Sequence, residues 1–268
     1  MARETEAVGR LVRQWRTTRG LSQLALAERA EVSTRHISFV ETGKSAPSRE
    51  MVLVLASALD VPLRERNRLL LAAGFAPVYR EEQLAAPHSR QMGELRRVLD
   101  LVIGHHDPYP AIVVDARWNA LAMNAGAQRV IAAFVDDPQV LAEVGGNAMH
   151  MVFHPRGFRP HLVNWHEIVR VTIERLRHEV IREPNGSASV LLDELRRYGP
   201  LPAMRDIVVG EPRLLIPVHL RRGDLELRFF TTIASLGTPI DITANELRIE
   251  TYYPVDDATA AWARAGLG

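Results

Sequence analysis

The sequence contains no cysteine and almost no lysine. Without cysteine the chain cannot form disulfides, use a thiolate nucleophile or bind zinc through sulfur. Lys44 is the only lysine among 33 basic residues, so arginine carries the positive charge. No hydrophobic run approaches the length needed to cross a bilayer, and the first residues lack the apolar segment of a secretory signal. These absences predict a cytoplasmic protein that does not associate with membranes.

The common catalytic motifs are missing as well. The chain has no GxSxG elbow, no GxxxxGK[ST] loop, no HExxH pair and no GxGxxG turn. His150 and His154 stand four residues apart, a spacing at which a helix can present two zinc ligands. However, Pro155 follows at once and no third ligand is indicated. We therefore expect neither an enzyme, nor a metal site, nor a resident cofactor.

Composition and length indicate a globular protein of two domains. The chain has 268 residues, of which 47% are hydrophobic and 24% are charged. The net charge of +1 conceals an asymmetry, because residues 1–80 hold 13 basic and 8 acidic residues, whereas the remainder holds 20 and 24. A basic N-terminal part is typical of a protein that binds nucleic-acid phosphates.

Residues 22–44 predict two short helices joined by a tight turn. Ser22 is a suitable N-cap for the first helix, in which Leu24 and Ala27 are expected to face inward. Glu31-Val32 forms the turn, and Ser33 caps the second helix. Two small helices with a short connection are the geometry of a helix-turn-helix, although ordinary helical hairpins share it.

The second of these helices has one apolar face and one polar, cationic face. Ile37 and Val40 are three residues apart and should be buried together, and Gly43 supplies the left-handed residue that ends the helix. The side chains that remain outward are Thr34, Arg35, Ser38 and Phe39. Such a face suits the recognition helix of a DNA-binding domain.

Further helices surround this pair and complete a five-helix bundle. Apolar stripes at helical spacing occur at Val8, Leu11, Val12 and Trp15 before it, and at Val52, Leu55, Ala56 and Leu59 after it. With the segments LVRQWRTTRGLSQ, VSTRHISFVETGKSAPS and LVLASALDVP, residues 8–80 resemble an XRE-type (Cro/repressor-like) helix-turn-helix domain. Including RERNRLLLAAGFAPVY, the whole chain resembles the MmyB-like transcription regulators.

The resemblance and the helix pattern together assign DNA contacts. Arg35 can form a bidentate pair with guanine, and Thr34 and Ser38 can bond to bases or phosphates. Phe39 is expected either against a thymine methyl or in the core. The residues expected to contact the DNA backbone are Gln23, Ser33, Lys44 and Arg49.

The second half predicts an α+β domain. We place the DNA-binding domain at residues 1–80, a linker at 81–92 and the second domain at 93–268, because the helical pattern dissolves between Phe75 and Met92, where Pro77 and Pro87 occur. Strands are predicted on both sides of a turn at Asp115, in a hairpin of residues 214–220 and 225–233, and over 247–253. In the last strand Leu247, Ile249 and Thr251 alternate with Arg248, Glu250 and Tyr252, which predicts one wetter face. An antiparallel sheet backed by helices resembles a PAS-like domain.

Sequence pattern leaves open whether this domain has a filled core or a cavity. The resemblance to MmyB-like regulators implies a cavity for a fatty acid or similar long-chain acid. Such a cavity would be mostly apolar with one or two polar anchors, and His154 or Asn164 is the predicted anchor for the carboxylate. The predicted lining residues are Tyr109, Met123, Phe153, Asn164, Trp165 and Phe229.

Together these features predict a one-component transcriptional regulator. One helix-turn-helix makes few contacts, so we expect a homodimer on a near-palindromic operator in double-stranded DNA, associated with the nucleoid when bound. An apolar ligand would act by favouring one dimer geometry. Two alternatives remain at this point: a second domain that serves only dimerisation or partner docking, and an enzyme fused to a DNA-binding domain.

Overall fold

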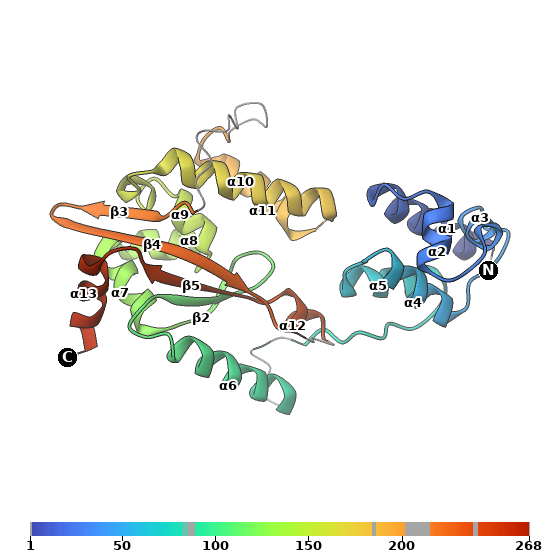
Figure 1. Cartoon of the computed structure of the whole chain (residues 1–268), viewed down its shortest axis with the longest axis horizontal. Helices are drawn as coiled ribbons and strands as arrows, with labels where there is room; N and C mark the ends of the chain where they lie inside the picture. The colour runs from blue at the N-terminus through green and yellow to red at the C-terminus, as the bar shows by residue number, and fades with distance from the viewer. Residues whose placement is uncertain are drawn as a thin grey trace. The chain divides into compact units, whose positions relative to one another are not determined.

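The computed structural model describes residues 2–82, 84, 89–183, 186–201, 215–237 and 241–267. The chain divides into two compact units (Figure 1). The first comprises residues 1–82 together with 238–245, which hold most of the short helix α12 (Ile242–Glu246). The second comprises residues 83–237 and 246–268.

The first unit contains the predicted five-helix bundle. Its helices are α1 (Ala2–Thr18), α2 (Gln23–Arg29), α3 (Thr34–Glu41), α4 (Arg49–Ala58) and α5 (Leu63–Ala72). Three of them begin at a serine whose hydroxyl accepts an otherwise unpaired amide hydrogen of the first turn. The acceptors are Ser22, Ser33 and Ser48. The sequence pattern therefore located the helix starts correctly.

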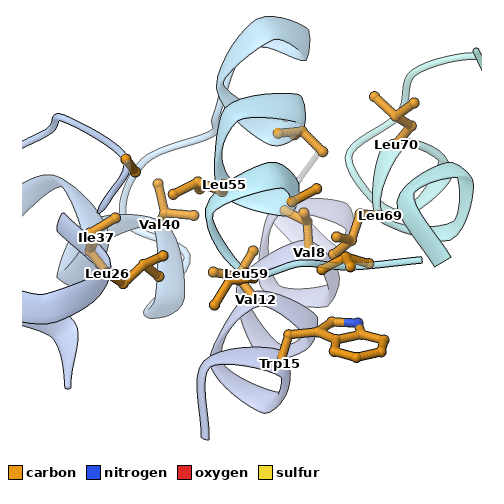
Figure 2. Packing of buried hydrophobic residues seen from close by; sticks show 14 of the residues in the cluster. Val8, Val12, Trp15, Leu26, Ile37, Val40, Leu55, Leu59, Leu69 and Leu70 are labelled. Atoms are coloured by element: carbon orange, nitrogen blue, oxygen red, sulfur yellow. The ribbon is translucent and has the colours of Figure 1, made fainter. Parts of the chain in front are cut away.

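Side chains from all five helices fill the core of this unit (Figure 2). The labelled core residues include Val8, Val12 and Trp15 of α1, and Ile37 and Val40 of α3. Helix α1 approaches α3 so closely that a Cβ at Gly9 would lie 2.3 Å from the carbonyl oxygen of Val40. Helix α3 is therefore packed closely against α1.

The turn between α2 and α3 contains a residue in a left-handed conformation. Glu31 has a φ of 54°, which lets the chain reverse within a few residues. One detail of the pattern was wrong: Leu24 is 58% exposed, and Leu26 occupies the inward position beside Ala27. The buried face of α2 is formed by Leu26, Ala27 and Ala30. Leu24 does not share this face with Leu26, because residues two apart on a helix do not face the same way.

The second unit is built on a five-stranded antiparallel sheet, as predicted. Its order is β2-β1-β5-β4-β3, and every neighbouring pair runs antiparallel. The strands are β1 (Ala111–Val114), β2 (Ala120–Met123), β3 (Val218–Arg222), β4 (Leu225–Ala234) and β5 (Arg248–Pro254). Strand β3 begins at Val218, later than the predicted residue 214, which lies outside the described residues.

Helices cover both faces of this sheet (Figure 1). Helix α6 (Arg90–Gly104) packs on the face that carries Ala111 and Val113. Ile112 and Val114 point to the opposite face. The helices beyond β2 are α7 (Ala125–Phe134), α8 (Pro138–Val144), α9 (Ala148–Phe153), α10 (Trp165–Arg182), α11 (Ser187–Leu195) and α13 (Asp257–Arg264). Short 3₁₀ turns follow α9, α11 and α13 at Arg159–His161, Arg196–Tyr198 and Ala265–Leu267.

Candidate DNA interface and ligand cavity

Helix α3 presents the predicted outer face to solvent. Ile37 and Val40 are fully buried, whereas Arg35 is exposed and Thr34 and Ser38 are partly exposed. The polar groups of this helix that can reach a base edge therefore lie together, on the side opposite the core.

Phe39 lies on the same face but is engaged with two cations. Its ring centroid is 5.1 Å from the guanidinium carbon of Arg35 and 5.9 Å from Nζ of Lys44. Both groups are within the range of cation–π attraction. Phe39 is half-buried, so the structure places it between the two roles considered from the sequence: it is neither a free surface residue nor part of the core.

The predicted backbone contacts occupy different environments. Lys44 and Arg49 are exposed and can reach a phosphate. Ser33 is exposed, but its hydroxyl accepts the amide hydrogen of His36 at 3.2 Å. The amide of Gln23 donates from Nε2 to the carboxylate of Glu41 at 2.8 Å. Ser33 and Gln23 therefore have structural bonds within the unit.

Glu41 is the centre of a buried network that sequence inspection missed. Besides Gln23, it accepts from Nε of Arg16 at 2.6 Å and from Nη2 at 3.1 Å, and its side chain is 2% exposed. This bidentate pair raises the pKa of Arg16 above its ordinary value. The available indication was the helix pattern, because Glu41 follows Ile37 by four residues and so falls on the buried stripe.

The second unit is hollow on the face of the sheet opposite α6. A cavity of about 680 Å³ lies there, within the range of roughly 300–1,000 Å³ for small-molecule sites. Its walls come from the five strands and from α7, α8, α9 and α10, and most of the lining groups are apolar. Representative lining residues are Ile112, Val130, Met151, Ile168, Leu220 and Phe229.

Two of the residues predicted to line a cavity do so, namely Met123 and Phe229. Phe153 and Trp165 do not, because their rings pack on one another with centroids 5.3 Å apart, and Arg159 covers Trp165. Tyr109 is also outside the cavity wall: its carbonyl accepts a hydrogen bond from Asn124, and its ring packs against His106. Phe153 and Trp165 therefore lie in the filled part of the core and not in the cavity wall.

The two predicted anchors for a carboxylate also lie outside the cavity wall. Asn164 donates to the carbonyl oxygen of Pro217 at 2.7 Å and so fixes the start of α10 beside β3. His154 is 7% exposed and bonds through Nε2 to Glu143 at 2.9 Å. Both side chains are occupied by structural hydrogen bonds.

The cavity has an arginine in its wall in place of the predicted anchors. Arg175 of α10 lines it, and the Nε of this side chain is buried without a hydrogen-bond partner among the described residues. Its guanidinium carbon lies 4.4 Å from the ring centroid of Trp118, which is fully buried. Burial lowers the pKa of Arg175, and the nearby carboxylates of Glu250 and Glu179 act in the opposite direction.

Two acidic groups of β5 face the same cavity. Glu250 is 7% exposed, and burial raises the pKa of its carboxyl group, opposed by Arg175. Burial and the neighbouring Glu250 also raise the pKa of Tyr252 well above its ordinary value. The prediction that this face of β5 is the wetter one was therefore wrong, because Glu250 and Tyr252 face the interior cavity and not bulk solvent.

The family called MmyB-like transcription regulator ligand binding domain matches residues 95–265. The chain belongs to this family. A helix-turn-helix family matches residues 12–66. The chain is also similar to the clp gene regulator ClgR from C. glutamicum, whose crystal structure shows 28% identity over 26% of this chain and 88% of that chain, with a TM-score of 0.24. No curated protein matches the chain.

These matches make the chain a DNA-binding helix-turn-helix regulator with an MmyB-like ligand-binding domain. The matched helix-turn-helix residues include α2 and α3, and the matched ligand-binding residues include every wall of the cavity. Among the described residues, none of the helices is both long and apolar enough to cross a membrane.

The side chain of His150 in this MmyB-like domain has protein partners. His150 is buried, bonds to the hydroxyl of Tyr198 at 3.0 Å and to Glu194 at 3.3 Å, and its pKa is lowered by burial and by Arg197. Within the described ranges, no cluster of three or more histidine and acidic side chains has the geometry to hold a metal ion.

The charged residues of the cavity wall that sequence inspection missed include Arg175 and Glu250. Arg175 follows Ile168 by seven residues, so it lies on the same stripe of α10 as the apolar lining residues. A charged residue on a buried stripe was the available indication. No such indication existed for Glu250, because a polar residue that alternates with apolar ones in a strand is ordinarily exposed.

Proposed function

We propose that this regulator responds to a long-chain acid, such as a fatty acid, bound in the cavity of its second domain. The observation that carries the proposal is the apolar cavity with Arg175 in its wall, whose Nε has no hydrogen-bond partner among the described residues. An apolar chain would fill the hollow, and a carboxylate would satisfy Arg175 by a charge-assisted hydrogen bond. Arg175 thus replaces His154 and Asn164 as the proposed anchor.

The DNA contacts that we propose follow from the exposed face of α3. Arg35 would bond to guanine, Thr34 and Ser38 to neighbouring bases or phosphates, and Lys44 and Arg49 to the backbone. Phe39 would contribute beside Arg35, to which it is already stacked.

A homodimer on a near-palindromic operator supplies the affinity that one helix-turn-helix lacks. The proposed domain limits are residues 1–80 for DNA binding and 93–268 for the ligand, joined by 81–92. Such a regulator would work in the cytoplasm and associate with the nucleoid when bound. The ligand changes DNA binding only if it binds one dimer geometry more tightly than the other.

Lipid extraction tests the proposal directly. Purified full-length protein is denatured, and the released lipids are identified by mass spectrometry, in parallel with Arg175→Met and with Arg170→Met. Arg170 lies on the same helix but does not line the cavity, so it is the matched control. We expect a long-chain acid from the wild type and from Arg170→Met, and much less from Arg175→Met.

A second measurement links the ligand to DNA. Delipidated protein is titrated onto its operator with and without tetradecanoic acid. A change in operator affinity that is absent in Arg175→Met supports a sensor. If no acid is released or bound and operator affinity is insensitive to it, the second domain serves dimerisation or docking instead.

A further inference from the structure

Arg175 and Glu250 both line the cavity, and their charges interact. Arg175 comes from α10, and Glu250 comes from the central strand β5, paired with Ile112 of β1. Glu250 is the charge that acts most strongly on Arg175. The other ionisable neighbours are Tyr252 on β5 and the ion pair of Arg248 with Glu179, whose atoms are 3.0 Å apart.

This pair differs from an ordinary buried salt bridge. The Nε of Arg175 has no acceptor among the described residues, and Nη1 of Arg248 and Nε1 of Trp118 are also buried without one. Both guanidinium groups lie against the indole of Trp118, at 4.4 Å for Arg175 and 5.2 Å for Arg248. Buried donors without an acceptor therefore surround Arg175. Among the described residues, the carboxyl groups that line the cavity are those of Glu250 and of Asp136 in the α7–α8 connection.

An acidic ligand would bring a second carboxylate to the same guanidinium. Two carboxylates that share one site in a poorly solvated interior repel each other, and one of them takes up a proton. Glu250 is already almost completely buried in the protein. Of the two carboxyl groups, it is therefore the one whose neutral form costs the least free energy.

We propose that Glu250 is a proton-linked selectivity residue of the cavity: an anionic head group binds to Arg175 only as Glu250 becomes protonated. This inference rests on the proposed function, because it requires an acid to be the ligand. Glu250 then opposes acids at high pH and leaves neutral ligands of the same length unaffected. The burial that already favours the neutral form of Glu250 lowers the free-energy cost of this proton uptake.

The test uses delipidated full-length protein and two probes, tetradecanoic acid and 1-tetradecanol, each competing with a neutral fluorescent naphthylamine. For the wild type, affinity for the acid should fall by up to about tenfold for each pH unit once the pH exceeds the pKa of Glu250 in the ligand-free protein, because one proton enters with the ligand. Affinity for the alcohol should stay constant. Glu250→Gln should bind the acid more tightly at high pH, with little pH dependence, and bind the alcohol as the wild type does.

Calorimetry gives a readout that does not depend on a variant. Titrating the acid into wild-type protein in two buffers of different ionisation enthalpy should show uptake of about one proton at pH values at which Glu250 is ionised in the ligand-free protein. Glu174→Gln, on α10 and outside the cavity wall, is the matched control and should retain that uptake. Glu250→Gln should lose it.

Three outcomes would overturn the inference: no proton uptake in the wild type, uptake that persists in Glu250→Gln, or an equal effect of that variant on acid and alcohol. Failure of the proposed function looks different, because then the acid does not displace the naphthylamine at any pH, whether or not the alcohol does. If the alcohol binds and the acid does not bind at any pH, the cavity takes neutral ligands and Glu250 has no role in admitting acids.

Discussion

Each unit of this chain buries an arginine close to a glutamate, and the two pairs are built differently. Arg16 and Glu41 of the first unit are joined by two hydrogen bonds of 2.6 and 3.1 Å, with Gln23 as a further donor. Arg175 of the second unit lies near Glu250, but its Nε is unpaired within the described part of the chain. The first pair is satisfied by the protein, whereas the second leaves a donor for a ligand.

The interiors differ in the same way. One continuous apolar cluster fills the first unit. In the second unit the apolar residues of the cavity face form clusters around a hollow of about 680 Å³. Because protein interiors are normally close-packed, a hollow with an arginine in its wall indicates a binding site, and a filled interior indicates a scaffold.

The largest effect should come from breaking the satisfied pair. Glu41→Ala leaves Arg16 buried without its carboxylate and should lower the free energy of unfolding of the first unit by about 3–5 kcal/mol. Urea denaturation followed by circular dichroism measures it. Glu28→Ala, at an exposed position of α2, is the control. A loss as small as that of the control would mean that the network does not hold α1 to α3.

Replacing the unsatisfied pair should have the opposite sign. The double variant Arg175→Met with Glu250→Leu removes two poorly paired buried groups, and we expect the ligand-free protein to be more stable by about 1–4 kcal/mol. Denaturation of delipidated protein, compared with wild type treated identically, measures the change. Destabilisation would contradict the view that these residues are retained for binding.

The pH dependence of stability sharpens the contrast. The folded state raises the pKa of Glu250, so this group favours folding less as pH rises from its unfolded pKa through its folded one. The side chain at this position cannot ionise in the variant Glu250→Gln. The variant should therefore become more stable than the wild type as the pH rises between the two pKa values, and the difference in unfolding free energy should stay constant at higher pH. Unfolding free energies at a series of pH values test this, and parallel curves for the two proteins would refute it.

On the DNA face, Arg35→Ala should weaken specific binding by about 1–3 kcal/mol and relax the base preference at one or two operator positions. Selection of binding sites from random DNA, together with affinity measurements, reports both effects. Arg13→Ala, exposed on α1, is the control. Unchanged base preference would remove Arg35 from the set of base-reading residues.

The smallest effect concerns the start of α3. Ser33→Ala removes the acceptor of the His36 amide hydrogen and should cost about 1 kcal/mol of stability. Ser33→Asp restores an acceptor and should recover it. Thermal unfolding of both variants is sufficient, and equal melting temperatures for all three proteins would show that the hydroxyl does not cap the helix.

The sequence predicted the first unit more fully than the second. Its helix caps at Ser22 and Ser33 and its core stripe from Val8 to Trp15 depend on local periodicity, which a sequence displays directly. The antiparallel sheet of the second unit was also predicted, because alternation and a short hairpin connection are local patterns.

The cavity residues were harder to find for a physical reason. Alternation in β5 distinguishes two faces of a strand but does not reveal whether the polar face meets water or an internal hollow. Glu250 and Tyr252 were therefore expected outside and lie inside. Which aromatic side chains fill the core and which line the hollow depends on how the helices pack, so Phe153 and Phe229 could not be separated by type alone.

The indole of Trp118 beneath Arg175 has an optical consequence. A cation held 4.4 Å from a buried indole influences its excited state, and a carboxylate that draws the cation away would change the emission. The chain has four tryptophans, and a variant that keeps only Trp118 would make the cavity report its own occupancy without any added dye.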